Sequence, residues 1–260
     1  MSLISDGHVY SYSQLSSFDE CPYGFYLQRI ERLEPQSNGF AEQGTLIHDL
    51  LDKWAKGEIP KEKLPEEYER RYPEEVVTAF PRMLAAKGYT QKTYQQGLDY
   101  FTNFDGFAGY TIIAAEEKFR TEIAGRPFIG IVDMVLKDDV TGEMLVVDHK
   151  SKSKTSFRKM EDAMYRQQLL YAQHVREKYG VWPDRMMFNL FKEGGEKMER
   201  PFTKEDFDNA VAWAGDIMDK IESFELIDWL DSKDQDFFCT EICSMRKHCH
   251  NGVAMPKKKR

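Results

Sequence analysis

The spacing of apolar positions changes near residue 110 of the chain. Before that point, apolar residues recur every three or four positions, which is the period of an amphipathic helix. We expect one helix over about residues 13–32, capped by Ser13, and a second over about 41–56. Two or three further helices are expected between about 66 and 104. The first part of the chain is therefore predicted to be helical.

After residue 110, β-branched and aromatic residues dominate short runs separated by Gly-containing turns, which is typical of strands. The three clearest runs are TIIAAEEKFRTEI, RPFIGIVDMVLKD and EMLVVDHKS. The short DDVTGE turn at 138–143 predicts that the last two runs pair as an antiparallel hairpin. The other expected elements are a helix at about 159–179, strands near 184–193 and 197–202, and a helix at about 204–224.

Helices followed by a mixed sheet and further helices indicate an α/β fold. No repeat or low-complexity linker interrupts the 260 residues, and Pro and Gly are scattered. We therefore expect residues 1–260 to form a single domain. Its parts are a helical region at 11–110, a sheet with its following helix at 111–200, and a C-terminal region at 201–260.

The composition is that of a folded globular protein, with 41% hydrophobic and 13% aromatic residues. No apolar run approaches the roughly 20 residues that a membrane span needs. The N-terminal residues have neither the basic start nor the apolar core of a secretory signal. We expect a soluble, cytoplasmic protein that does not bind membranes.

The formal net charge of −8 argues against a protein that coats nucleic acid non-specifically. A nuclease is compatible with this charge, because such enzymes gather carboxylates around metal ions. Basic residues are concentrated at 150–159 and in the PKKKR tail at 256–260. We expect the tail to be a flexible tether to DNA, and the alternative is a solvated end without a function.

Two carboxylates lie inside apolar strand sequences, Asp133 in GIVDMVL and Asp148 in VVDHKSK. Buried carboxylates are costly without a partner. On neighbouring strands of one hairpin they would face each other, and Lys150 would lie two residues beyond Asp148 on the same face. Hard oxygen ligands favour Mg²⁺ or Mn²⁺. The alternative is an Asp–Lys pair at a strand end.

Helical motifs on either side of these strands complete a larger pattern. The segment GTLIHDLLDKW places His48 on a helix before the sheet, and QQLLY places Gln167 and Tyr171 on one face of the helix after Lys150. With the opening SYSQLSSFDECPYGFYL and the EKF segment, their order from about residue 11 to 249 resembles the RecB-like branch of the PD-(D/E)xK nuclease superfamily. The resemblance implies a restriction-endonuclease-like core, a central mixed β-sheet flanked by helices.

The resemblance also implies roles for single residues in metal-assisted phosphodiester hydrolysis. His48, Asp133 and Asp148 would bind the metal, the carbonyl of His149 would complete the site, and Lys150 would position the attacking water. Asp148 departs from the many relatives that carry Glu at this position, which leaves the coordination number open.

Three further residues receive roles from the resemblance. Gln167 and Tyr171 would align the DNA backbone, with ordinary helix packing as the alternative. Glu117 would be an acidic group near the metal, with a solvent-facing strand residue as the alternative.

The implied activity is a Mg²⁺- or Mn²⁺-dependent DNA exonuclease acting on single-stranded ends from 5′ to 3′. Two other functions stay open at this point. One is a non-catalytic subunit that binds DNA ends or serves CRISPR adaptation, against which the retained Asp133, Asp148 and Lys150 speak. The other is a nuclease that acts on RNA, because the catalytic residues contact phosphate and not sugar.

The four cysteines form one pattern, with Cys21 near the start and Cys239, Cys243 and Cys249 near the end. Disulfides are disfavoured inside cells, so a metal centre is the better explanation. Zinc sites ordinarily use C-x₂-C pairs, whereas the spacing here is C-x₃-C-x₅-C. A [4Fe–4S] cluster fits better. Zinc, with His248 or His250 as a substitute ligand, and unligated thiols are the alternatives.

This cysteine arrangement resembles the iron–sulfur, CRISPR-associated RecB-like exonucleases. The resemblance implies DNA as the partner, together with recombination, repair or CRISPR-adaptation proteins, in a cellular or phage setting. Many of these relatives have two residues between the first two cysteines of the C-terminal triplet, where this chain has three.

Overall fold

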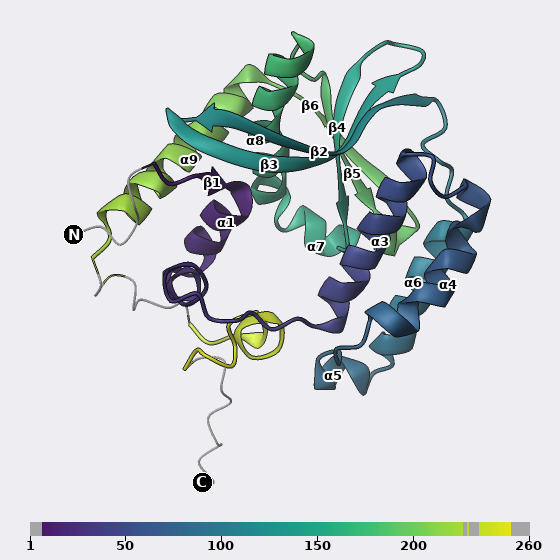
Figure 1. Cartoon of the computed structure of the whole chain (residues 1–260), viewed down its shortest axis with the longest axis horizontal. Coiled ribbons are helices and arrows are strands. Elements are labelled where there is room, and N and C mark those ends of the chain that lie inside the picture. The colour runs from purple at the N-terminus through teal and green to yellow at the C-terminus, as the bar shows by residue number, and fades with distance from the viewer. Residues whose placement is uncertain (1–6, 226–227, 229–233, 251–260) are drawn as a thin grey trace.

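The computed structural model describes residues 7–225, 228 and 234–250. Its centre is a six-stranded mixed sheet in the order β1-β3-β4-β5-β6, and β2 pairs with β3. Helices cover both faces of this sheet (Figure 1). The PKKKR tail, for which we predict a DNA tether, lies outside the described residues.

The first predicted helix is interrupted. It begins one residue earlier than expected, with α1 at Tyr12–Glu20, and continues after a break as α2 at Pro22–Phe25 and a π-helical turn at Tyr26–Ile30. The predicted cap, Ser13, lies inside α1, and Ser11 occupies the N-cap position without a capping hydrogen bond from its side chain. The break falls at Cys21, whose backbone is extended at φ −160° and ψ 102°. A residue before proline is sterically pushed out of the helical region. Pro22 therefore turns a continuous apolar pattern into two helices, with Cys21 at the corner.

One face of the sheet is covered by helices from the first half of the chain. These are α3 at Gly39–Ala55, α4 at Leu64–Glu75 and α6 at Tyr89–Thr102, with the short α5 at Arg82–Ala85 between them. Leu46, Ile47 and Leu50 of α3 are fully buried against strand residues such as Met134 and Val147. This packing places the adjacent polar stripe of α3, which includes His48, beside the sheet.

The strands follow the expected order. They are β1 at Tyr10–Ser11, β2 at Tyr110–Ile123, β3 at Arg126–Asp138, β4 at Met144–Lys150, β5 at Arg185–Leu190 and β6 at Glu196–Pro201. The β3–β4 hairpin is antiparallel, as predicted, whereas β4 and β5 run parallel. Both β1 and β4 pair with β3, β1 at residues 128–129 and β4 at 134–137. The intervening residues of β3 therefore lie between these two partners.

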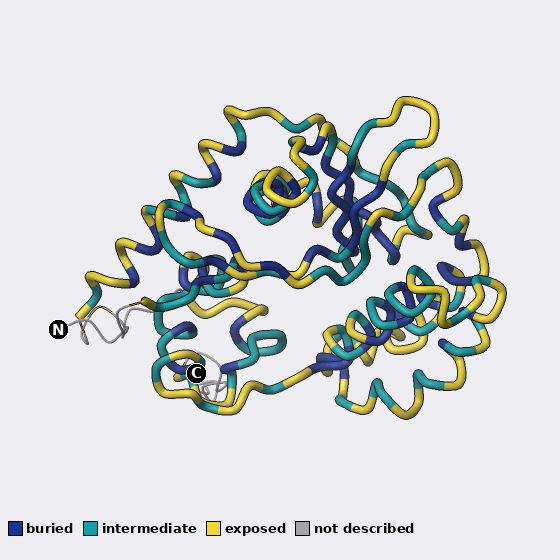
Figure 2. Tube along the Cα trace, turned by 45° about the horizontal axis from the view of Figure 1, so that its top comes forward, coloured by how far each residue is buried: buried dark blue, intermediate teal, exposed yellow. Residues whose placement is uncertain are grey.

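The other face of the sheet packs against the later helices. Here α8 at Glu161–Tyr179 and α9 at Lys204–Ser223 bury an apolar core, and a short α7 at Lys154–Arg158, absent from the sequence prediction, precedes α8. Buried positions follow the strands and the inner sides of the helices (Figure 2). No helix in the described part of the chain is long and apolar enough to cross a bilayer.

Candidate active site

The two strand carboxylates lie where the β3–β4 ladder ends. Its last pair is Met134 with Val147, and Asp133 and Asp148 are the next residues on each strand. The backbone N–H of His149 donates to Oδ2 of Asp133 at 2.8 Å. Asp148 is only 4% exposed. The hairpin therefore brings two acidic groups together at the point where its strands separate.

His48 joins these carboxylates from α3. Its Nε2 lies 2.9 Å from the carbonyl oxygen of His149, and a carbonyl only accepts, so Nε2 carries the proton. Its Nδ1 lies 3.5 Å from Asp133 and 4.0 Å from Glu116. The His149 carbonyl, for which we predict a metal contact, thus fixes the ring tautomer and leaves the Nδ1 lone pair facing two carboxylates.

Glu116 is the acidic group that sequence reasoning missed. It lies opposite Asp133 in the β2–β3 ladder, between the pairs Ala115–Met134 and Glu117–Val132, and its φ is +45°. A left-handed conformation is uncommon for a residue with a side chain. The ligand atoms of Glu116, Asp133 and His48 all lie within 4.8 Å of one another. In the sequence, Glu116 and Glu117 are adjacent, so either could have been chosen as the acidic group near the metal.

Glu117 lies on the opposite face of the same strand. Its carboxylate pairs with His174 and Lys178 and accepts a hydrogen bond from Tyr179 at 3.1 Å. The structure therefore places the predicted acidic group away from His48 and Asp133. We replace Glu117 by Glu116 among the candidate ligands.

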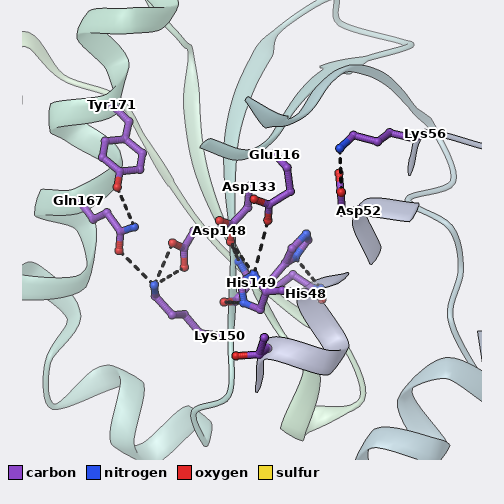
Figure 3. Close-up of polar contacts among 12 residues, drawn as sticks. His48, Asp52, Lys56, Glu116, Asp133, Asp148, His149, Lys150, Gln167 and Tyr171 are labelled. Carbon is purple, nitrogen blue, oxygen red and sulfur yellow. Dashed lines mark hydrogen bonds and ion pairs between the residues drawn. The ribbon is translucent and has the colours of Figure 1, made fainter. Parts of the chain in front are cut away.

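Lys150 connects Asp148 to α8. Its Nζ lies 2.8 Å from Oδ2 of Asp148 and donates to Oε1 of Gln167 at 3.1 Å. The amide of Gln167 donates in turn to the hydroxyl of Tyr171 at 3.3 Å. The carboxylate of Asp148 faces Lys150, and the group of His48, Glu116 and Asp133 lies next to it (Figure 3). Strand β4 and α8 therefore hold the ammonium in a fixed position.

Burial and charge shift the pKa values of these groups. Burial raises the pKa of Asp133, although His48 and Lys150 oppose the shift. Burial likewise raises the pKa of Asp148 to about 6, against the attraction of Lys150. For His48, burial acts to lower the pKa, but Glu116, Asp133 and Asp148 outweigh it and raise the value. A bound cation would relieve this crowding of acids.

These residues open into a cavity of about 760 Å³. Its wall follows one face of α3 and continues over the ends of the strands; the lining includes Phe40, Gly44, His48, Asp52, Glu116, Asp133, Lys150 and Ser151. A Cβ at Gly44 would meet nothing within 4 Å. One imidazole nitrogen and two carboxylates in an open cavity fit a hard divalent cation with room for substrate and water.

The predicted cysteine ligands are all free thiols. Burial raises the pKa of Cys243, and the charges of Cys21, Cys249 and Cys239 add to the increase. Two hydrogen bonds join the segment after the π-helical turn to the C-terminal segment: the backbone N–H of Gln36 donates to the carbonyl of Ser244 at 2.8 Å, and the side-chain amide of Asn38 donates to the carbonyl of Ile242. The two sequence-distant cysteine segments therefore lie next to each other.

Metal binding is expected to become stronger as pH rises through about 6. In the metal-free protein the raised pKa values of Asp133 and Asp148 favour protonated carboxyls, so their contribution to folding is present at low pH and is lost as pH rises, for Asp148 through about 6. A cation binds the ionised carboxylates and offsets that loss. Saturating Mn²⁺ should raise the melting temperature by about 5–10 °C at pH 8 and by much less at pH 5.

Thermal melts with and without Mn²⁺ at both pH values would measure this shift. Asp133→Asn should remove it, whereas Asp139→Asn, in the distant hairpin turn, should keep it. An equal shift at pH 5 and pH 8 would contradict the carboxylate site.

The chain was compared with protein families, curated proteins and solved structures. The family model of the PD-(D/E)XK nuclease superfamily matches residues 9–250. No curated protein sequence matches the chain. Among solved structures, a proposed exonuclease from Eubacterium rectale is 13% identical, covers 83% of this chain and 80% of its own, and has a TM-score of 0.48. The mixed sheet flanked by helices, the acidic group at the strand ends and the family match together show that this chain belongs to the PD-(D/E)XK nuclease superfamily.

Proposed function

We propose that this protein is a Mg²⁺- or Mn²⁺-dependent exonuclease that degrades single-stranded DNA from 5′ to 3′. The observation that carries the metal-dependent hydrolysis is the group of His48, Glu116 and Asp133 beside the Lys150 ammonium. The preference for single strands and the polarity rest on the resemblance of the sequence to RecB-like exonucleases.

Different residues of the site would bind the cation and position the nucleophile. His48, Glu116 and Asp133 would hold the cation, with Asp148 as the neighbouring acid. The cation supplies a more acidic water and neutralises charge on the phosphate. Lys150 holds the nucleophile and stabilises the developing oxyanion, because Asp148 and Gln167 fix its Nζ. Tyr171 supports this arrangement through Gln167.

A digest of end-labelled substrates tests the proposal. Single-stranded DNA, duplex DNA and RNA of one sequence, each labelled at the 5′ or the 3′ end, are incubated with Mg²⁺, Mn²⁺ or EDTA. We expect metal-dependent release of short 5′ products from single-stranded DNA. Cleavage of RNA alone would show that the substrate is RNA and not DNA. Tight DNA binding without cleavage would favour a non-catalytic subunit.

We also propose a [4Fe–4S] cluster on Cys21, Cys239, Cys243 and Cys249. Its support is the mutual proximity of the thiols and the N–H···S contacts at 3.4 Å from Gly24 to Cys21 and from Met245 to Cys243. Thiolates on one zinc ion lie about 4 Å apart. Among the described residues, the cysteines form no group of three within 4.8 Å. We also propose that residues 1–260 form one domain, because such a cluster would join its two cysteine segments.

Protein purified without oxygen is expected to carry about four irons per chain and to absorb broadly near about 400 nm. Cys21→Ala should lose the iron and destabilise the whole chain, because the cluster would tie its two ends together. Iron analysis and a thermal melt measure both effects. Stoichiometric zinc without iron would contradict the cluster and leave the nuclease proposal standing.

A further inference from the structure

Two lysines beside the candidate active site form no ion pair within the described part of the chain, although the charge of Glu20 acts on one of them, Lys152. Strands β4 and β5 are parallel and their last registered pair is Lys150 with Leu190. Lys152 and Lys192 each follow two residues later, Lys152 in the loop before α7 and Lys192 in a 3₁₀ turn at Phe191–Glu193. Parallel register therefore brings both lysines to the same end of the sheet, next to Lys150.

Both ammonium groups are half-buried, and among the described residues neither forms an ion pair. Nζ of Lys152 contacts the sulfur of Met160, at 3.7 Å. Nζ of Lys192 lies over the ring of Phe40, 4.4 Å from its centre. Burial, together with the positive charges of Lys152 and Lys92, lowers the pKa of Lys192 to about 8. The protein thus holds like charges together at a cost to its own stability.

This pair of lysines lies at the rim of the candidate active-site cavity. Phe40 and Ser151, which adjoin the two lysines, line the same cavity as His48 and Asp133. Two residues of extended chain span about 6.6 Å, so Lys152 lies about one phosphate step from Lys150. Phe40 lies eight residues before His48 on α3, which corresponds to about 12 Å along the helix. The cavity is therefore acidic at the metal ligands and basic at this rim.

We propose that Lys152 and Lys192 bind the phosphate next to the one that is cleaved, on the same nucleic-acid strand. The proposal rests on the nuclease function above. It adds that the substrate must carry a negatively charged phosphate next to the scissile bond. Phe40 is a positioning residue, because its ring holds the Lys192 ammonium at the rim without neutralising it. A phosphate would relieve the repulsion between the lysines and complete their hydrogen bonds.

Binding of a single-stranded DNA oligonucleotide in EDTA, followed by fluorescence anisotropy, tests the proposal without turnover. The K152Q/K192Q variant should bind at least tenfold more weakly. The slope of log affinity against log salt should fall by about 0.7 for each phosphate that the variant no longer neutralises. The control K137Q/K220Q removes the same charge from exposed residues of β3 and α9 and should bind like the parent.

Melting temperature separates a binding role from a structural one. Lys192→Met keeps an apolar stem over Phe40 and removes the repelled charge. We expect this variant to be at least as stable as the parent and to bind DNA more weakly. A clear loss of stability with unchanged DNA affinity would assign Lys192 to the fold and overturn the proposal.

The place of the phosphate is tested with a substrate that carries one neutral methylphosphonate linkage. The neutral linkage is placed at each position of the strand in turn. It should slow cleavage by the parent most when it lies beside the scissile bond, and at that position it should slow cleavage by K152Q/K192Q only slightly more. Equal sensitivity of parent and variant at every linkage would overturn the assignment. If inorganic phosphate raised the melting temperature of the parent as much as DNA does, the two lysines would form a site for free anions, which would overturn the proposal. A parent that neither binds nor cleaves nucleic acid would remove the proposed function itself.

Discussion

Asp148→Asn and Lys150→Met are each expected to lower the rate of DNA cleavage by about 10³-fold or more, which corresponds to about 4 kcal/mol of transition-state stabilisation. Asp148 holds the Lys150 ammonium at 2.8 Å, and Gln167 fixes it from α8. Either replacement removes the positioned charge beside the cation site. Loss of such a group affects the transition state more than binding, so affinity for DNA should fall much less than the rate.

Single-turnover cleavage of end-labelled DNA and anisotropy in EDTA measure the two effects. Asp139→Asn, in the hairpin turn, is the matched control for Asp148→Asn and should be as active as the parent. Each substitution leaves one charge of the buried Asp148–Lys150 pair without its partner. This loss can destabilise the fold, so melting curves of both variants are measured as well. Two folded variants that cleave nearly as fast as the parent would rule out this catalytic assignment.

Glu116→Gln and Glu117→Gln are expected to differ by about 100-fold in activity, although the residues are adjacent and the substitution is the same. Glu116 lies opposite Asp133 and close to His48, so its replacement removes a candidate metal ligand. Glu117 pairs with His174 and Lys178 on the other face. Its replacement should cost about 1 kcal/mol of stability and leave cleavage intact.

Cleavage rates over a range of Mn²⁺ concentrations check this contrast, because Glu116→Gln should also raise the metal concentration needed for half-maximal activity. Glu117→Gln should require the same metal concentration as the parent. If Glu117→Gln proved to be the inactive variant, Glu117 would take the place of Glu116 among the candidate metal ligands.

The element order was predictable because local periodicity reports which side of each element is buried. The hairpin of β3 and β4 and the long helices α8 and α9 agree with the prediction to within a few residues. The break at Cys21 was missed, since the apolar spacing continues across it and only the following Pro22 marks it. Asp133 and Asp148 were also recognisable, because a charged residue within an apolar strand needs a partner.

The sequence by itself determined the mixed α/β architecture, the superfamily motifs and the carboxylates of β3 and β4, because these depend on short-range spacing. Only the tertiary structure decided which glutamate faces His48, since the register of β2 on β3 places Glu116 opposite Asp133, and adjacent strand residues point to opposite faces. It also decided that Lys152 and Lys192 meet beside the site. Their proximity comes from the parallel register of β4 and β5, which joins residues forty positions apart and leaves no local pattern in the chain.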